Sequence, residues 1–171
     1  MYALITHRWL KFKVILLFFL LSCQSNIIPK EAKLALPNGK IIDISLAITF
    51  EEQKKGLSGV SKEKFNKTQG MFFFYLEDGL RQFWMPDTYF DLDMFFLDKN
   101  LRVLKVLRKV PAHPGMETPP PIFRTQPFFC RHVLEMRADS PLAAQIKKGF
   151  TLQWMGKLSL SEIESKIRRP K

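Results

Sequence analysis

Short apolar runs separated by turn residues are the feature that most constrains the fold of this chain. Large aliphatic side chains occupy every second position from Ile42 to Ile48, which is the pattern of a half-buried strand. The run 70–76 is apolar throughout, as expected for a strand that is covered on both faces. About seven strands are expected in total, because similar runs recur along the chain, at 81–85, 92–97, 101–110, 131–137 and 150–158.

Turn residues predict how these strands are connected. Asp78-Gly79 predicts a hairpin between the runs on either side of it. The residues 98–100 predict a second hairpin, from the run 92–97 into the run 101–110. Apolar residues of that last run fall on odd and even positions, which indicates a β-bulge or burial on both sides.

Two or three short helices begin at capping patterns. Residues 49–52 (Thr-Phe-Glu-Glu) form a capping box, and Ser140-Pro141 is a helix cap followed by a proline. A second capping box at 159–162 predicts a basic C-terminal helix. The expected fold is a mainly antiparallel α+β domain with a curled or barrel-like sheet.

The N-terminus has the pattern of an export signal. Arg8, Lys11 and Lys13 precede the apolar run 14–21, which covers only about 12 Å of a hydrocarbon core that is about 30 Å thick. Such a run is typical of a secretory signal and not of a membrane-spanning helix. It ends in Leu-Leu-Ser-Cys at 20–23, which resembles the lipobox of bacterial lipoproteins. That resemblance implies cleavage before the cysteine and its modification with acyl chains such as palmitate; an ordinary signal peptide with an incidental cysteine is the alternative.

Lipid on Cys23 would divide the chain into four segments. Cys130, the other of two cysteines, would then have no partner for an intrachain disulfide and is expected to be a buried thiol. In a cell with two membranes, Gln24 after the cysteine favours the outer one, because aspartate there is the retention signal for the inner one. The segments are a signal peptide (1–22), a lipidated tether (23–37), one globular domain (38–158) and a basic tail or helix (159–171).

The charge of the chain restricts its partners. The formal charge of +11 falls to +8 without residues 1–22, which contain three basic residues and no acidic one. For an envelope protein, this favours anionic lipid headgroups, acidic glycans or an acidic envelope protein. The basic residues are scattered and follow no aromatic–basic pattern, so nucleic acid is not an expected partner.

Seven segments resemble, in their order and spacing, the bacterial and archaeal family known as domain of unknown function 192. The match covers roughly Ile41 to Leu158 and implies a small barrel-like α+β domain, commonly exported, without an established activity. The chain departs from the family pattern at Ser58, at Pro86-Asp87 and at 138–140. The matching segments are Lys55-Gly56-Leu57-Ser58, Gly70-Met71-Phe72-Phe73, Phe83-Trp84-Met85, Asp87-Thr88, residues 92–98, Val133-Leu134-Glu135 and Lys148-Gly149.

Four aspartates in the apolar stretch 82–98 are candidate functional groups. Asp98 and Asp87 have the sequence context of turn residues, and Asp91 is expected to face solvent. Asp93 lies within an apolar strand and on a family motif, so it is either a buried hydrogen-bond acceptor or part of a pocket. Its expected donors are Arg81, the indole of Trp84 or backbone amides.

Catalysis would require a second carboxylate, for which Glu135 is the candidate. Asp93 and Glu135 together would suit hydrolysis or transfer on envelope glycans or lipids. A Cys130–His132 nucleophile is a weaker option, because the spacing does not aim the two groups at one another. A copper site from His113, Met116, Cys130 and His132 is a further alternative, although these residues lack a fixed ligand spacing.

These observations favour a binding protein over an enzyme. The leading hypothesis is a non-catalytic envelope lipoprotein that binds its ligand through Trp84, Met85, Asp93 and Asp87, near the proline-rich segment 111–130. No cofactor and no established metal site is expected.

Overall fold

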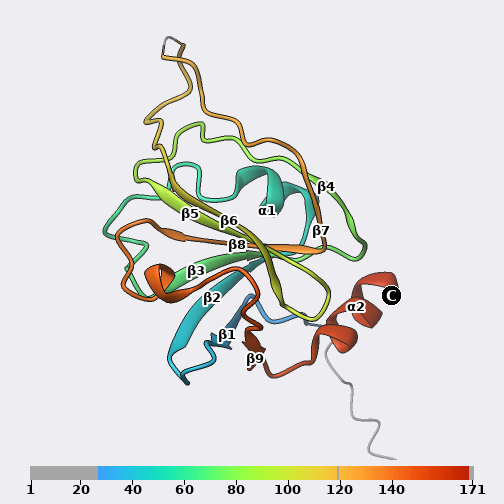
Figure 1. The fold of residues 1–171 in the computed structure, drawn as a ribbon. Coiled ribbons are helices and arrows are strands. Elements are labelled where there is room, and N and C mark those ends of the chain that lie inside the picture. The colour runs from blue at the N-terminus through green and yellow to red at the C-terminus, as the bar shows by residue number, and fades with distance from the viewer. Residues whose placement is uncertain (1–26, 119, 170–171) are drawn as a thin grey trace, which may run out of the picture.

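The computed structural model describes residues 27–118 and 120–169, and the expected signal peptide (1–22) and Cys23 lie outside them. A curled sheet of seven strands forms a half-barrel, with helix α1 against one side and helix α2 near its lower end (Figure 1). The helices are α1 (Phe50–Lys55), the 3-10 helix η1 (Ala143–Gln145) and α2 (Leu160–Arg168). The strands are β1 (Glu31–Ala35), β2 (Ile41–Ala47), β3 (Gln69–Phe73), β4 (Gly79–Arg81), β5 (Leu92–Leu97), β6 (Val103–Val110), β7 (Phe128–Cys130), β8 (His132–Arg137) and β9 (Gln153–Trp154).

The sheet is mixed, which corrects the expectation of a mainly antiparallel sheet. Its strand order is β6-β5-β8-β3-β2-β1-β9, and β2 and β3 pair in parallel while the other neighbours are antiparallel. The connection between β2 and β3 explains this parallel pair. Helix α1 and the turns after it carry the chain back to the level at which β2 begins, so β3 runs in the same direction as β2. The expectations of a curled sheet, about seven strands and short helices are confirmed.

Two hydrophobic clusters cover the two faces of this sheet. Phe72 belongs to one cluster and its neighbour Phe73 to the other, as alternation along a strand requires. All six residues of β5 and all six of β8 are buried. Both strands are therefore covered on both sides, which explains why most of their residues are apolar.

One expected strand connection and the length of one expected strand are different in the structure. Asp78-Gly79 does not join β3 to a paired strand, because β4 pairs with β7 in a separate two-stranded sheet. The second hairpin, between β5 and β6, is confirmed and contains the expected bulge. The segment 150–158 contributes only the short β9, since Gly156 and the turn after it end the pairing.

The chain ends also differ in part from expectation. Residues 31–35 lie within the expected tether, yet they form β1 because Ala32 and Leu34 alternate with charged residues and pair with β2. The capping boxes of α1 and α2 are confirmed. Ile163 of α2 is fully buried against the sheet, so this helix is part of the folded domain. Among the described residues, no helix is long and apolar enough to cross a membrane.

Candidate functional site

A pocket of about 400 Å³ opens between α1, the end of β3 and the segment 80–86. We name it the Glu135 pocket, because the carboxyl group of Glu135 in β8 is the only one among its described lining residues. The other lining residues are Phe50, residues 53–58, Phe73, Tyr75, residues 80–86, Thr88 and Leu92.

Glu135 occupies this position because of the register of the central strands. It pairs with Met71 of β3 and with Met94 of β5, so its side chain emerges on the face that α1 covers. Glu135 is only 4% exposed, and no described residue forms a hydrogen bond with its carboxyl group. Burial raises the pKa of this carboxyl to about 8, so the acid is mainly protonated at neutral pH.

Tyr75 and Arg81 form one wall of the pocket. The guanidinium of Arg81 lies over the Tyr75 ring, 3.8 Å from its centroid, and donates a hydrogen bond of 2.7 Å to the carbonyl of Glu77. Its buried Nε has no acceptor among the described residues. Burial raises the pKa of Tyr75 to about 12, so its phenol stays protonated. The wall therefore contains a buried donor without a partner among the described residues, beside a neutral phenol.

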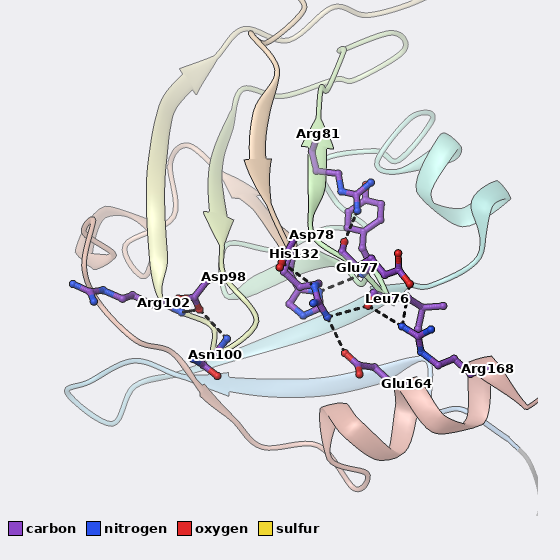
Figure 2. A network of polar contacts seen from close by, with 12 residues as sticks. Leu76, Glu77, Asp78, Arg81, Asp98, Asn100, Arg102, His132, Glu164 and Arg168 are labelled. Atoms are coloured by element: carbon purple, nitrogen blue, oxygen red, sulfur yellow. Dashed lines mark hydrogen bonds and ion pairs between the residues drawn. The ribbon is translucent and has the colours of Figure 1, made fainter.

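A polar network fixes the chain between Tyr75 and Arg81 (Figure 2). Arg131 donates to the Leu76 carbonyl at 2.9 Å and to Asp78 at 3.0 Å, and it also contacts Glu164 of α2 at 3.2 Å. Helix α2 thus helps to hold the pocket wall, although it does not line the pocket.

The mouth of the pocket combines basic and aromatic side chains. Lys54 and Lys55 line it from α1 and are exposed. Trp84 is 40% exposed, and the guanidinium of Arg124 lies 4.6 Å from its ring centroid. This mouth favours a ligand that carries negative charge and some apolar surface.

The proline-rich segment supports Trp84 and Met85 from outside. Trp84 forms an isolated β-bridge with Arg124, and the amide of Met85 donates to the Phe123 carbonyl at 3.2 Å. Met85 is 1% exposed and lines the pocket with its side chain. The structure thus brings Trp84, Met85 and Glu135 together, and it connects them to the segment 111–130.

Asp93 lies on the opposite face of the sheet, so the structure does not bring it together with Glu135. Asp93 pairs with Met136, and the next pair along the two strands is Met94–Glu135. Because side chains of successive pairs point to opposite faces of a sheet, Asp93 and Glu135 are on different sides. Its carboxylate accepts hydrogen bonds from the guanidinium of Arg108 at 2.6 Å and from the Lys109 amide at 2.9 Å. Backbone amides were among the expected donors; the guanidinium comes from Arg108 in place of Arg81.

The position of Asp93 explains its presence in an apolar strand. The pairing of β5 with β6 shifts register beside it, and Lys109 in this bulge has a positive φ of 51°. Asp93 satisfies the amide that the bulge exposes, while Arg108 also donates to the Ala143 carbonyl at 2.8 Å. The carboxylate therefore stabilises a bulge and its contact with η1.

The other three aspartates lie outside the strands and accept hydrogen bonds from backbone amides. Asp98 accepts from the amides of Asn100 and Arg102, and Asp91 is exposed and accepts from the Ala112 amide at 2.8 Å. Asp87 has a φ of 51°, and its carbonyl accepts from the Gly59 amide. Asp87 does not line the Glu135 pocket.

The residues considered for nucleophilic or copper chemistry are not gathered at one place. Cys130 packs in the cluster on the α1 side, whereas the His132 ring contacts Phe72 and Phe74 on the other face. Both ring nitrogens of His113 face backbone carbonyls, at 3.2 and 2.9 Å. Among residues 27–118 and 120–169, no group of three or more His, Cys, Asp or Glu side chains is placed to hold a metal ion.

Comparison with known proteins identifies the family of this chain. The family model of domain of unknown function 192, described as an uncharacterized ACR, matches residues 33–154. The chain belongs to this family. No curated protein matches the sequence.

Two solved structures share the fold of this domain-192 chain. A protein of unknown function from Novosphingobium aromaticivorans DSM 12444 is 28% identical over 72% of this chain and 84% of its own, with a TM-score of 0.56. A protein from Sinorhizobium meliloti 1021, described as a proposed transcription regulator, is 23% identical over 72% of this chain and 92% of its own, with a TM-score of 0.55. The second likeness shows the fold alone.

Several pocket residues of the domain-192 chain are not indicated as functional by any pattern in the sequence. Lys54 and Lys55 follow a capping box and read as ordinary helix-end cations. Tyr75 lies within the apolar run 70–76, and nothing in the pattern distinguishes it from core residues. The segment Leu80–Arg81 was expected in a hairpin with β3, which would have placed it elsewhere. In the structure, Leu80 and Arg81 line the pocket from β4, which pairs with β7 and not with β3.

Proposed function

We propose that this protein is a lipid-anchored envelope protein that binds an acidic glycan fragment in the Glu135 pocket and does not transform it. The lipobox pattern at 20–23 supports the anchor and the envelope location, with the outer membrane as the site in a cell that has two membranes. The pocket supports the binding role.

The observation that carries this proposal is the buried, unpaired carboxyl group of Glu135. A protonated carboxyl offers one hydrogen-bond donor and an acceptor, which suits a hydroxyl or an amide of a ligand. Lys54, Lys55 and Arg81 favour a ligand that also carries negative charge. Acidic saccharides combine these groups with apolar ring faces that can lie against Trp84.

Binding fits this pocket better than hydrolysis does. Glycoside hydrolysis commonly uses two carboxyl groups about 5 to 9.5 Å apart. Of the described residues, Glu135 alone supplies a carboxyl group to the pocket, and Asp93 lies across the sheet. Asp93 and Glu135 therefore do not form the pair of carboxyl groups that such a mechanism requires.

Replacing Glu135 by alanine should weaken binding of soluble, acidic peptidoglycan fragments by about tenfold or more, because a buried hydrogen bond of this kind contributes about 1–3 kcal/mol. Glu135→Gln, which keeps a donor and an acceptor, should stay within about threefold of wild type. Isothermal titration calorimetry on the chain of residues 24–171, which contains every described helix and strand, measures both.

The pH dependence of the same titration provides an internal check. The ligand binds the protonated acid, so wild-type affinity should fall as pH rises above about 8, whereas the affinity of Glu135→Gln should not show this fall. Glu63→Gln, an exposed acid outside the pocket, is the matched control. Absence of binding by wild type, or equal binding by Glu135→Ala, would contradict the proposal.

The anchor is tested separately through Cys23. Cells that express the full chain should incorporate labelled palmitate into it and retain it in the membrane fraction, because two or three acyl chains anchor a protein effectively permanently. Cys23→Ser should abolish the label, and Cys130→Ser should leave it unchanged. A label that persists in Cys23→Ser would refute lipidation at this residue.

A further inference from the structure

Large apolar side chains are exposed around the mouth of the Glu135 pocket. Phe50 is 73% exposed and Leu80 is 69% exposed, and both line the pocket with Trp84. Phe129 is 62% exposed and lies directly opposite Leu80 in the β4–β7 pair, so the two side chains share one face. We call these four side chains the apolar rim. Exposed apolar groups that gather in this way mark an interaction surface.

Basic side chains are interspersed with the apolar rim. Lys54 and Lys55 line the same mouth from α1, and Arg81 lines it from β4. The acidic residues of the same helix, Glu51 and Glu52, do not line it. Glu135 in the floor is mainly uncharged at neutral pH, so the charge presented at the mouth is positive.

The first described residues connect the N-terminal side of the chain to this surface. Lys30 forms an ion pair with Glu52 of α1, the helix that supplies Phe50 to the rim. Cys23 precedes Lys30 by seven positions, which extend to at most about 24 Å. An anchor at Cys23 therefore keeps α1 close to the bilayer.

We propose that the apolar rim and its basic neighbours dock on an anionic phospholipid surface, with the apolar side chains at the acyl boundary and the cations against phosphates. Because Lys54, Lys55 and Trp84 also line the pocket mouth, the membrane and the proposed glycan would compete for them. The position of the anchor rests on the lipidation proposed above, whereas the surface itself does not. Charge complementarity favours this partner over a second copy of the chain, because pairing two such surfaces would oppose cations with cations.

The test uses residues 24–171, which lack Cys23 and so measure the surface without acyl chains. Co-sedimentation should show binding to vesicles with about one third phosphatidylglycerol in phosphatidylcholine, and at least tenfold weaker binding to pure phosphatidylcholine. Binding should weaken strongly as salt rises from about 0.1 to about 0.5 M. Lys54→Gln with Lys55→Gln should reduce affinity by roughly 25-fold, since each basic residue near an anionic surface contributes about fivefold.

Matched variants separate the rim from the rest of the molecule. Leu80→Gln with Phe129→Gln should reduce binding at least fivefold, whereas Met155→Gln, 48% exposed but away from this pocket, should not. Near-UV circular dichroism confirms that each variant is folded. Glu135→Gln should bind vesicles like wild type, so failure of the glycan proposal would leave this result unchanged.

Three outcomes would overturn the docking proposal. The first is equal binding to neutral and anionic vesicles, and the second is an equal loss of binding in the rim and Met155 variants. The third is that wild type binds no vesicles but forms a dimer in sedimentation velocity, and that the rim variants abolish this dimer.

Discussion

Replacing Glu135 by glutamine should raise the free energy of unfolding by about 3 kcal/mol at pH 7. The folded protein holds the Glu135 proton up to a pKa of about 8, whereas the unfolded chain releases it near 4.5. Between these values the folded state binds the extra proton, so stability falls as pH rises. Each pH unit in this window removes about 1.4 kcal/mol, and glutamine has no proton to lose.

Urea denaturation of wild type and Glu135→Gln at several pH values measures this effect. The two proteins should be similar below about pH 4.5, diverge up to about pH 8, and stay separated by a constant amount above it. Glu117→Gln, at an exposed position, is the control and should show no such divergence. A difference that is independent of pH would mean that the Glu135 carboxyl is ionised in the folded state.

Replacing Asp93 by alanine should have the opposite effect and lower the free energy of unfolding by about 2–3 kcal/mol. The variant leaves the Lys109 amide and the Arg108 guanidinium without their acceptor. The effect lies below the usual range for buried ion pairs because the Arg108 side chain is 38% exposed and water can replace part of the contact.

The matched control for Asp93 is Asp43→Ala in β2. Asp43 also pairs with a basic residue, Lys33, but both side chains are more than half exposed. Such a pair contributes about 0–1 kcal/mol, so the two variants should differ clearly in urea denaturation. Equal effects would mean that the contacts of Asp93 with the bulge contribute little. If binding to the Glu135 pocket is lost in a folded Asp93→Ala protein, the assignment of Asp93 to structure alone is wrong.

The elements that the sequence predicted well are those with local signals. The alternation from Ile42 to Ile48 predicts β2, and the capping boxes at 49–52 and 159–162 predict α1 and α2. The apolar run 70–76 predicts β3, in which Gly70, Phe72 and Phe73 are buried. These signals depend on neighbours within a few residues, which is why they can be read directly.

The features that the sequence did not predict depend on distant pairing. Nothing near Gly79 indicates that β4 pairs with β7, about fifty residues later in the chain. The faces of Asp93 and Glu135 depend on the register between β5 and β8 and on a bulge opposite Asp93. A shift of one residue in that register would have placed both carboxyl groups on the same side. The sequence therefore indicates individual candidate residues, but it does not indicate which of them lie together in the folded protein.

The two parts of the Glu135 pocket differ in how freely they can change. Its floor belongs to β8, a strand that is hydrogen-bonded to β3 and β5 on its two sides and buried over its whole length. Its mouth is built from a six-residue helix and the segment 80–86, which contribute exposed side chains. Substitutions in these two segments would alter the shape and charge offered to a ligand without touching the sheet. The ligand specificity of this domain can therefore be redesigned by exchanging α1 and the segment 80–86, while Glu135 stays fixed in the sheet.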